Sequence, residues 1–201
     1  MLTRIAAVVI FAALGSANFQ LNFPESTGYD AQTESTGPCG GVAVNLQMSN
    51  MTFFDVDGAS IYVTSEHQIT DYLFRATLDN SLEKGWTDVF PVIQQHGIGD
   101  FCLPSVSMPS NFNGQTGVFQ VIANTSTGMF FQCAVVMFQP GKAKPQGACR
   151  NGSSVFAEYI TNDVSLNSIA RQSSETFMSS SMSTSTSALA SSMSSMSGMS
   201  I

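Results

Sequence analysis

The segment MFFQCAVVMF, Met129–Phe138, contains a single polar residue, Gln132, among its ten positions. A run that is apolar at almost every position is typical of a central strand covered on both faces. Similar β-branched and aromatic runs, bounded by turn residues, recur at short intervals along the chain. These runs are Met51–Val56, Ser60–Thr64, Tyr72–Leu78, Asp88–Ile93 and Val118–Ala123. The spacing predicts an all-β fold, a β-sandwich.

Two further features refine this expectation. Apolar and polar residues alternate over Tyr72–Thr77, which favours a strand buried on one face only. Helix is expected only as short turns, one at Ser65–Asp71 and one within Val155–Ala170, because neither segment has a continuous apolar stripe.

Residues 1–17 have the features of a secretory signal peptide. Arg4 provides the positive charge, Ile5–Leu14 the apolar stretch, and Gly15–Ala17 the small residues of a cleavage site. The alternative of a membrane anchor is disfavoured, because a spanning helix needs roughly 20 apolar residues. Cleavage after Ala17 would make Asn18 the first residue of an extracellular or cell-surface protein.

The composition excludes some partners. The chain carries 7 Lys and Arg against 14 Asp and Glu, a formal net charge of −7, and loss of the leader removes one cation and no acid. We therefore expect no nucleic-acid partner. The acidity is compatible with cation binding, but ordinary solubility is the favoured explanation. With 10% charged and 43% apolar residues, the chain fits a β-rich extracellular domain.

All four cysteines follow the leader, and an even number in an exported protein predicts two disulfides. A zinc site is disfavoured because there is no CxxC pair and neither His67 nor His96 has zinc-finger spacing. Three pairings are possible. We favour one between two strand-like segments, leaving the other two cysteines for the second bond. The favoured pairs are Cys102 with Cys133 and Cys39 with Cys149.

The sequence predicts one domain, residues 18–160, followed by a disordered Ser/Thr/Met-rich stalk at 161–201. Three sequons, at Asn50, Asn124 and Asn151, predict glycosylated surface loops. The chain ends at Ile201 without the apolar tail of a glycolipid-anchor signal. We therefore predict no anchor, and contact with a membrane only if the C-terminus is incomplete.

Five short blocks carry a family resemblance. They are NFQLNFP (Asn18–Pro24), GYD (Gly28–Asp30), GPCGG (Gly37–Gly41), GIGDFC (Gly97–Cys102) and FQCA (Phe131–Ala134). In their order and spacing they resemble the fungal copper-acquisition proteins related to lytic polysaccharide monooxygenases, over Asn18 to about Cys149. The resemblance implies a secreted or cell-surface fungal protein with an immunoglobulin-like or fibronectin-like sandwich. It also implies copper binding without oxidation of polysaccharide.

The copper ligands of that family are the N-terminal His, a second His early in the domain, and an Asp directly after a Cys-Ala pair. The resemblance places them at Asn18, His67 and Val135, so two of the three side-chain ligands are substituted. Cu(II) favours imidazole and amine nitrogens with carboxylate support, and valine offers no donor. We therefore expect a degenerate copper site and no cofactor. The alternatives for His67 are a weak copper ligand and a leftover histidine without metal; His96 is not a ligand position.

No catalytic residue can be nominated. There is no GxSxG elbow, Asp55 with Asp57 form an acidic pair that a solvated loop explains, and Trp86 is expected in the core rather than as a sugar platform. We predict a non-enzymatic protein with cell-wall or surface components as partners. The alternative is weak Cu(II) binding and copper uptake through the Asn18 amine and His67. A copper-dependent oxidative enzyme is the least favoured hypothesis.

Overall fold

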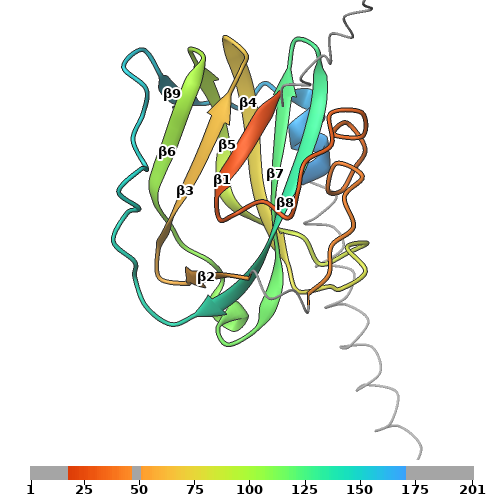
Figure 1. Ribbon diagram of the computed structural model, residues 1–201, viewed down its shortest axis with the longest axis vertical. Coiled ribbons are helices and arrows are strands. Elements are labelled where there is room, and N and C mark those ends of the chain that lie inside the picture. Colours follow the sequence, from red (N-terminus) through yellow and green to blue (C-terminus); the bar gives the residue numbers. More distant parts are fainter. Residues whose placement is uncertain (1–17, 47–50, 171–201) are drawn as a thin grey trace, which may run out of the picture.

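The computed structural model describes residues 18–46 and 51–170 as two β-sheets packed face to face (Figure 1). The three-stranded sheet has the order β1-β3-β6, and the six-stranded sheet has the order β2-β8-β7-β4-β5-β9. The strands are β1 Phe19–Phe23, β2 Thr52–Asp55, β3 Ala59–Ser65, β4 Ile69–Thr77, β5 Thr87–His96, β6 Gly99–Val106, β7 Thr116–Thr125, β8 Gly128–Gln139 and β9 Phe156–Tyr159. This arrangement confirms the predicted all-β sandwich.

The core lies between the sheets, and strand periodicity decides which side chains reach it. Successive side chains of a strand point to opposite faces. In β8, Phe130, Ala134, Val136 and Phe138 therefore join the main core cluster. Cys133, on the other face, is 1% exposed, so β8 is covered on both faces as its sequence predicts.

The prediction that β4 is buried on one face only is wrong. This strand is covered on both faces. Tyr72 and Phe74 pack in the central core. Leu73, between them, points to the outer face of the sheet and is 1% exposed there. It packs with Val92, Ile122 and Leu166 in a separate cluster. A helix that follows β9 brings Leu166 onto this face, and the local pattern in β4 carried no sign of it.

The helical expectations were half right. Ser65–Asp71 is not helical: it contains the end of β3, a tight connection and the start of β4. The Ser65 and Thr70 hydroxyls lie 2.7 Å apart across this connection. The segment Val155–Ala170 contains both β9 and a helix at residues 164–170. Asp163 caps that helix, since its Oδ1 accepts a hydrogen bond from the Leu166 main-chain N at 2.9 Å.

The disulfide pairing that the sequence favoured is wrong. The bonds are Cys39–Cys133 and Cys102–Cys149. In β6, Phe101 and Leu103 face the core, so Cys102 between them points outward. Cys133 points away from the core on the opposite sheet. The two side chains therefore lie on opposite outer faces of the sandwich and cannot form a disulfide. Each instead ties a loop to the outside of its own strand.

The packed domain continues past residue 160. Leu166, in the segment assigned from the sequence to the stalk, is fully buried against the sheet. Residues 171–201, with most of the predicted stalk, lie outside the described residues, as do residues 1–17 and Asn50. Over the ranges 18–46 and 51–170, no helix is long and apolar enough to cross a membrane.

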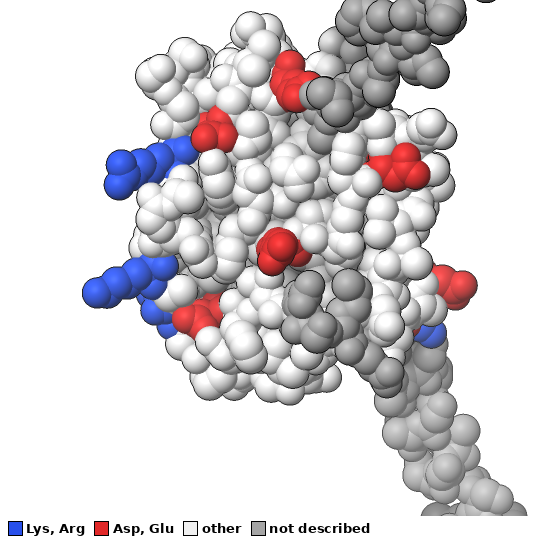
Figure 2. Space-filling view, viewed as in Figure 1, with Lys and Arg blue, Asp and Glu red and all other residues white. Residues whose placement is uncertain are grey.

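The surface is sparsely charged. On the face shown in Figure 2, acidic side chains stand singly, separated by uncharged surface. Asn151 is exposed, as its sequon predicts. Asn124 is only partly exposed, and its Nδ2 donates a hydrogen bond to Asp163 Oδ2 at 2.8 Å. The two sequons that the structure describes therefore differ in accessibility.

Candidate functional site

Asn18 and His67, two of the three positions that the family resemblance implies, meet in the structure. β1 pairs antiparallel with β3, and the register sets Phe19 opposite Ser65. Asn18 therefore lies beside the connection that follows β3, where its carbonyl oxygen accepts a hydrogen bond from Glu66 N at 3.2 Å. His67 Nε2 lies 3.1 Å from Asn18 Oδ1.

Two contacts position His67, one made by its main chain and one by its ring. Its main-chain N donates to the Ser65 hydroxyl at 3.1 Å, which fixes the connection. The ring stacks on Phe130 of β8, with centroids 6.3 Å apart and planes at 14°. This packing directs Nε2 toward Asn18.

A buried carboxylate, Glu34, completes the group around Asn18. Glu34 Oε2 accepts hydrogen bonds from the Asn18 main-chain N at 3.2 Å and from Asn18 Nδ2 at 3.1 Å. The side chain is 2% exposed. Its main-chain oxygen accepts a hydrogen bond from Phe131 N of β8, and the Cys39–Cys133 disulfide holds the same loop against the same strand.

These contacts determine the orientation of the Asn18 amide and the donor role of His67 Nε2. A carboxylate only accepts hydrogen bonds, so the amide nitrogen of Asn18 must face Glu34 and its Oδ1 must face His67. Because Oδ1 also only accepts, His67 Nε2 carries a hydrogen in this arrangement. A metal at Nε2 would have to displace that hydrogen and break the contact with Asn18.

Gln132, the polar residue within MFFQCAVVMF, supports the group from β8. Its Nε2 donates to the Phe19 carbonyl oxygen at 2.6 Å and to Glu34 Oε1 at 3.2 Å. Its Oε1 accepts from Leu21 N at 2.9 Å. The side chain is 1% exposed, so these are interior bonds that join β1, β8 and the Glu34 loop.

Val135, the third implied position, is not part of this group. It lies opposite Val118 in β7 and, by the alternation of β8, faces the same outer side as Cys133. Val135 is 2% exposed. The carboxylate that accompanies Asn18 and His67 is therefore Glu34, which sequence reasoning missed. Its only sequence signal is an acid five residues before Cys39, in a loop that a disulfide fixes.

The Tyr29 phenol lies close to Glu34. The Tyr29 hydroxyl is buried and has no hydrogen-bond partner within the described residues. Burial raises the pKa of the Tyr29 phenol, and the charges of Glu34, Glu66 and Asp30 raise it further.

The donors fit a copper ion only in part. Asn18 N, after cleavage of the leader, and His67 Nε2 are nitrogen donors that suit Cu(II), and Glu34 could add a carboxylate oxygen. The side chain of Asn18 supplies an amide where the family has an imidazole. Within 18–46 and 51–170, no three His, Cys, Asp or Glu side chains group closely enough to hold a metal.

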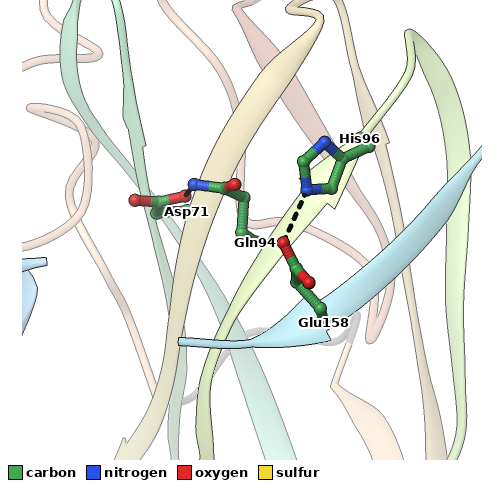
Figure 3. A network of polar contacts seen from close by, with 4 residues as sticks. All are labelled: Asp71, Gln94, His96 and Glu158. Atoms are coloured by element: carbon green, nitrogen blue, oxygen red, sulfur yellow. Dashed lines mark hydrogen bonds and ion pairs between the residues drawn. The ribbon is translucent and has the colours of Figure 1, made fainter. Parts of the chain in front are cut away.

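His96 is engaged elsewhere. Its Nε2 lies 3.1 Å from Glu158 Oε1 on β9 (Figure 3). Its ring stacks on Phe156 with centroids 4.7 Å apart. In the same view, Gln94 Nε2 donates to Asp71 Oδ1 at 2.7 Å. His96 thus has an ordinary structural role on the β5–β9 edge.

The other candidates from the sequence also have structural roles. Asp55 Oδ1 accepts from Gln139 Nε2 at 2.6 Å, and Asp57 Oδ2 accepts from Gly141 N at 3.2 Å. Trp86 is 8% exposed and lies under the Arg75 guanidinium, so its ring is not available for stacking on a sugar.

Known proteins are similar to this chain over most of its length. A family model described as copper acquisition factor BIM1-like matches residues 16–154. An uncharacterized protein of Aspergillus fumigatus is 27% identical over 167 residues, covering 78% of this chain and 68% of that protein. The lytic polysaccharide monooxygenase-like protein X325 of Yarrowia lipolytica is 26% identical over 167 residues, covering 78% of this chain and 62% of the relative.

Proposed function

The chain belongs to the BIM1-like copper acquisition factor family, and we propose that it is a non-enzymatic member whose copper site has degenerated. It acts outside the cell or at the cell surface, with cell-wall or surface components as its partners. The leader-like residues 1–17 and two disulfides in a β-sandwich support export.

The Asn18–His67 contact carries this proposal. The Asn18 amide forms a hydrogen bond with each of its two neighbours. Its Oδ1 accepts from His67 Nε2, and its Nδ2 donates to Glu34 Oε2. A metal must break both hydrogen bonds and gains no side-chain nitrogen from Asn18 in return. Loss of an outer-sphere partner alone typically costs roughly 10–100-fold in metal affinity, and loss of a direct ligand should cost more.

The convergence of donors favours a second candidate, weak Cu(II) binding in copper uptake. His67 Nε2 lies 3.1 Å from Asn18 Oδ1, and Glu34 Oε2 lies 3.2 Å from the Asn18 main-chain N, which becomes an amine after cleavage. In this case the amine and imidazole would hold the ion, and the carboxylate would offset part of its charge. An oxidative enzyme is the least supported alternative, because no specific contact favours it.

Cu(II) titration of secreted protein distinguishes these functions. The protein must begin at Asn18, as shown by mass spectrometry, and binding is followed by calorimetry and electron paramagnetic resonance. The degenerate site predicts no binding above that of an unrelated acidic glycoprotein. Stoichiometric binding with a nitrogen-rich spectrum that His67→Ala abolishes would contradict it and support copper uptake. His96→Ala is the matched control, since it removes a histidine away from the site.

Oxidase activity needs a separate measurement. Copper-dependent formation of hydrogen peroxide from oxygen and a reductant, above the level of free copper, would support the enzyme hypothesis. Its absence in a folded sample agrees with the non-enzymatic proposal.

A further inference from the structure

Glu34 is a buried acid, and within residues 18–46 and 51–170 no Lys, Arg or His side chain pairs with it. Its carboxylate accepts three hydrogen bonds, all from amide nitrogens: Asn18 N at 3.2 Å, Asn18 Nδ2 at 3.1 Å and Gln132 Nε2 at 3.2 Å. A buried carboxylate without a cation is costly, and neutral donors offset that cost only in part.

The missing cation can come from the main chain. Hydrolysis of the Ala17–Asn18 peptide bond during export adds one water, which leaves a carboxylate on Ala17 and an amine on Asn18. The ordinary pKa of an α-amino group is about 7.7–8.0, so this amine takes up a proton and is an ammonium at neutral pH. The same nitrogen already lies 3.2 Å from Glu34 Oε2.

We propose that Glu34 is the internal acceptor for the processed N-terminus. Cleavage after Ala17 turns a neutral hydrogen bond into a partly buried ion pair between the Asn18 ammonium and the Glu34 carboxylate. This pair fixes β1 to the disulfide-held loop that carries Glu34 and thereby stabilises the exported form over the precursor. The inference rests on the export part of the proposed function and does not depend on copper.

The local field supports the pair. The charges of Glu34, Glu66 and Asp30 all raise the pKa of the Tyr29 phenol, so Glu34 lies among other acidic groups before cleavage. Glu34 is fixed by the Phe131 N hydrogen bond and by Gln132, so it is in position to receive the charge. Preorganisation of this kind keeps the cost of pairing low.

The test compares two N-termini. Chains that begin at Asn18 and at Ala17 both keep a donor N–H at residue 18, but only the first places a charge beside Glu34. Each is prepared with Glu34 and with Glu34→Gln, treated with chelator, and melted at pH 7. We expect the Asn18 chain to melt on the order of 10 °C higher, because losing one partner of a buried ion pair is strongly destabilising. In Glu34→Gln this gap should close.

Glu25→Gln is the matched control, because Glu25 is an exposed acid in the same N-terminal segment. The gap between the two N-termini should persist in this variant. Equal melting temperatures for the two chains with Glu34 present, or an unchanged gap in Glu34→Gln, would overturn the proposal.

A second measurement needs no substitution at Glu34. Acylation of the α-amine in native protein at pH 7 should be at least about 10-fold slower for the Asn18 chain than for the Ala17 chain. The reason is that pairing with Glu34 favours the ammonium form, which does not react with the reagent. Equal rates would contradict the ion pair, as would a secreted protein that begins at another residue. A chain that shows the pair but binds copper tightly would overturn the degenerate site alone.

Discussion

Gln132 of the six-stranded sheet is joined to Phe19 of the three-stranded sheet, because its Nε2 donates a hydrogen bond to the Phe19 carbonyl oxygen at 2.6 Å. The bond links the centre of β8 to the first residue of β1. Three polar groups of its neighbours depend on this one buried side chain: Phe19 O, Leu21 N and the Glu34 carboxylate. The position of Asn18, one residue before β1, therefore depends on Gln132.

Gln132→Leu should lower the free energy of unfolding by about 2–4 kcal/mol. The substitution keeps the approximate volume but leaves buried polar groups without their partner, at about 1–3 kcal/mol each. Urea denaturation measures the change. Gln20→Leu is the control, since Gln20 makes only a local bond to Leu21 O, and we expect it to change stability by less than about 0.5 kcal/mol. Similar losses in both variants would contradict the role of Gln132.

Restoring a ligand should work at Asn18 and fail at Val135. Asn18→His places an imidazole beside His67, and we expect Cu(II) affinity to rise by more than about 100-fold. Val135→Asp should add no affinity, because residue 135 faces the outer side of β8, and it should destabilise the fold by placing a charge at a site that is 2% exposed. Calorimetry of both variants gives the comparison. Tighter copper binding by Val135→Asp would show that the face is assigned incorrectly.

Peptide mapping under non-reducing conditions should recover Cys39–Cys133 and Cys102–Cys149 and no peptide that joins Cys102 to Cys133. Replacing both Cys39 and Cys133 with Ser should cost about 4 kcal/mol, since the bond closes a loop between residues 94 positions apart. The double variant should also narrow the gap in melting temperature between the Asn18 and Ala17 chains, because the Glu34 loop loses its tie to β8. An unaffected gap would show that the tie is not needed.

The helix at 164–170 can be tested as part of the domain. Leu166→Ala should cost about 2–4 kcal/mol, because Leu166 is fully buried against Leu73, Val92 and Ile122. Val164→Ala is the matched control in the same turn, since Val164 is 80% exposed. Chemical denaturation distinguishes the two. A silent Leu166→Ala would place the end of the domain before residue 161.

Asp71 should make stability depend on pH. Burial raises the pKa of the Asp71 carboxyl, and Asp163 raises it further. A carboxyl whose pKa is raised on folding contributes most to stability below its unfolded pKa of about 3.9, and the contribution is lost as the pH rises through the folded pKa. Asp71→Asn should therefore raise the melting temperature at pH 7 and have little effect on it at pH 4. Thermal melts at both values test this, and a larger gain at pH 4 would contradict the sign.

The sequence predicted the fold because strand periodicity is a local property. MFFQCAVVMF indicated a strand covered on both faces, and each of the other predicted runs lies along one strand of the sandwich. β1 was missed as a strand although Phe19 and Leu21 alternate toward the core. Asn18 and His67, which the family resemblance implied for one site, lie in contact.

The tertiary structure decided the rest. The pairing of the four cysteines depends on which face of its sheet each side chain occupies, and that depends on which residues the opposite sheet covers. In the same way, Val135 faces outward and Glu34, an acid in a Ser/Thr-rich loop, becomes the buried carboxylate at the N-terminus. A sequence specifies the alternation along each strand. Only the packing of loops against strands distant in sequence determines which charged group meets which partner.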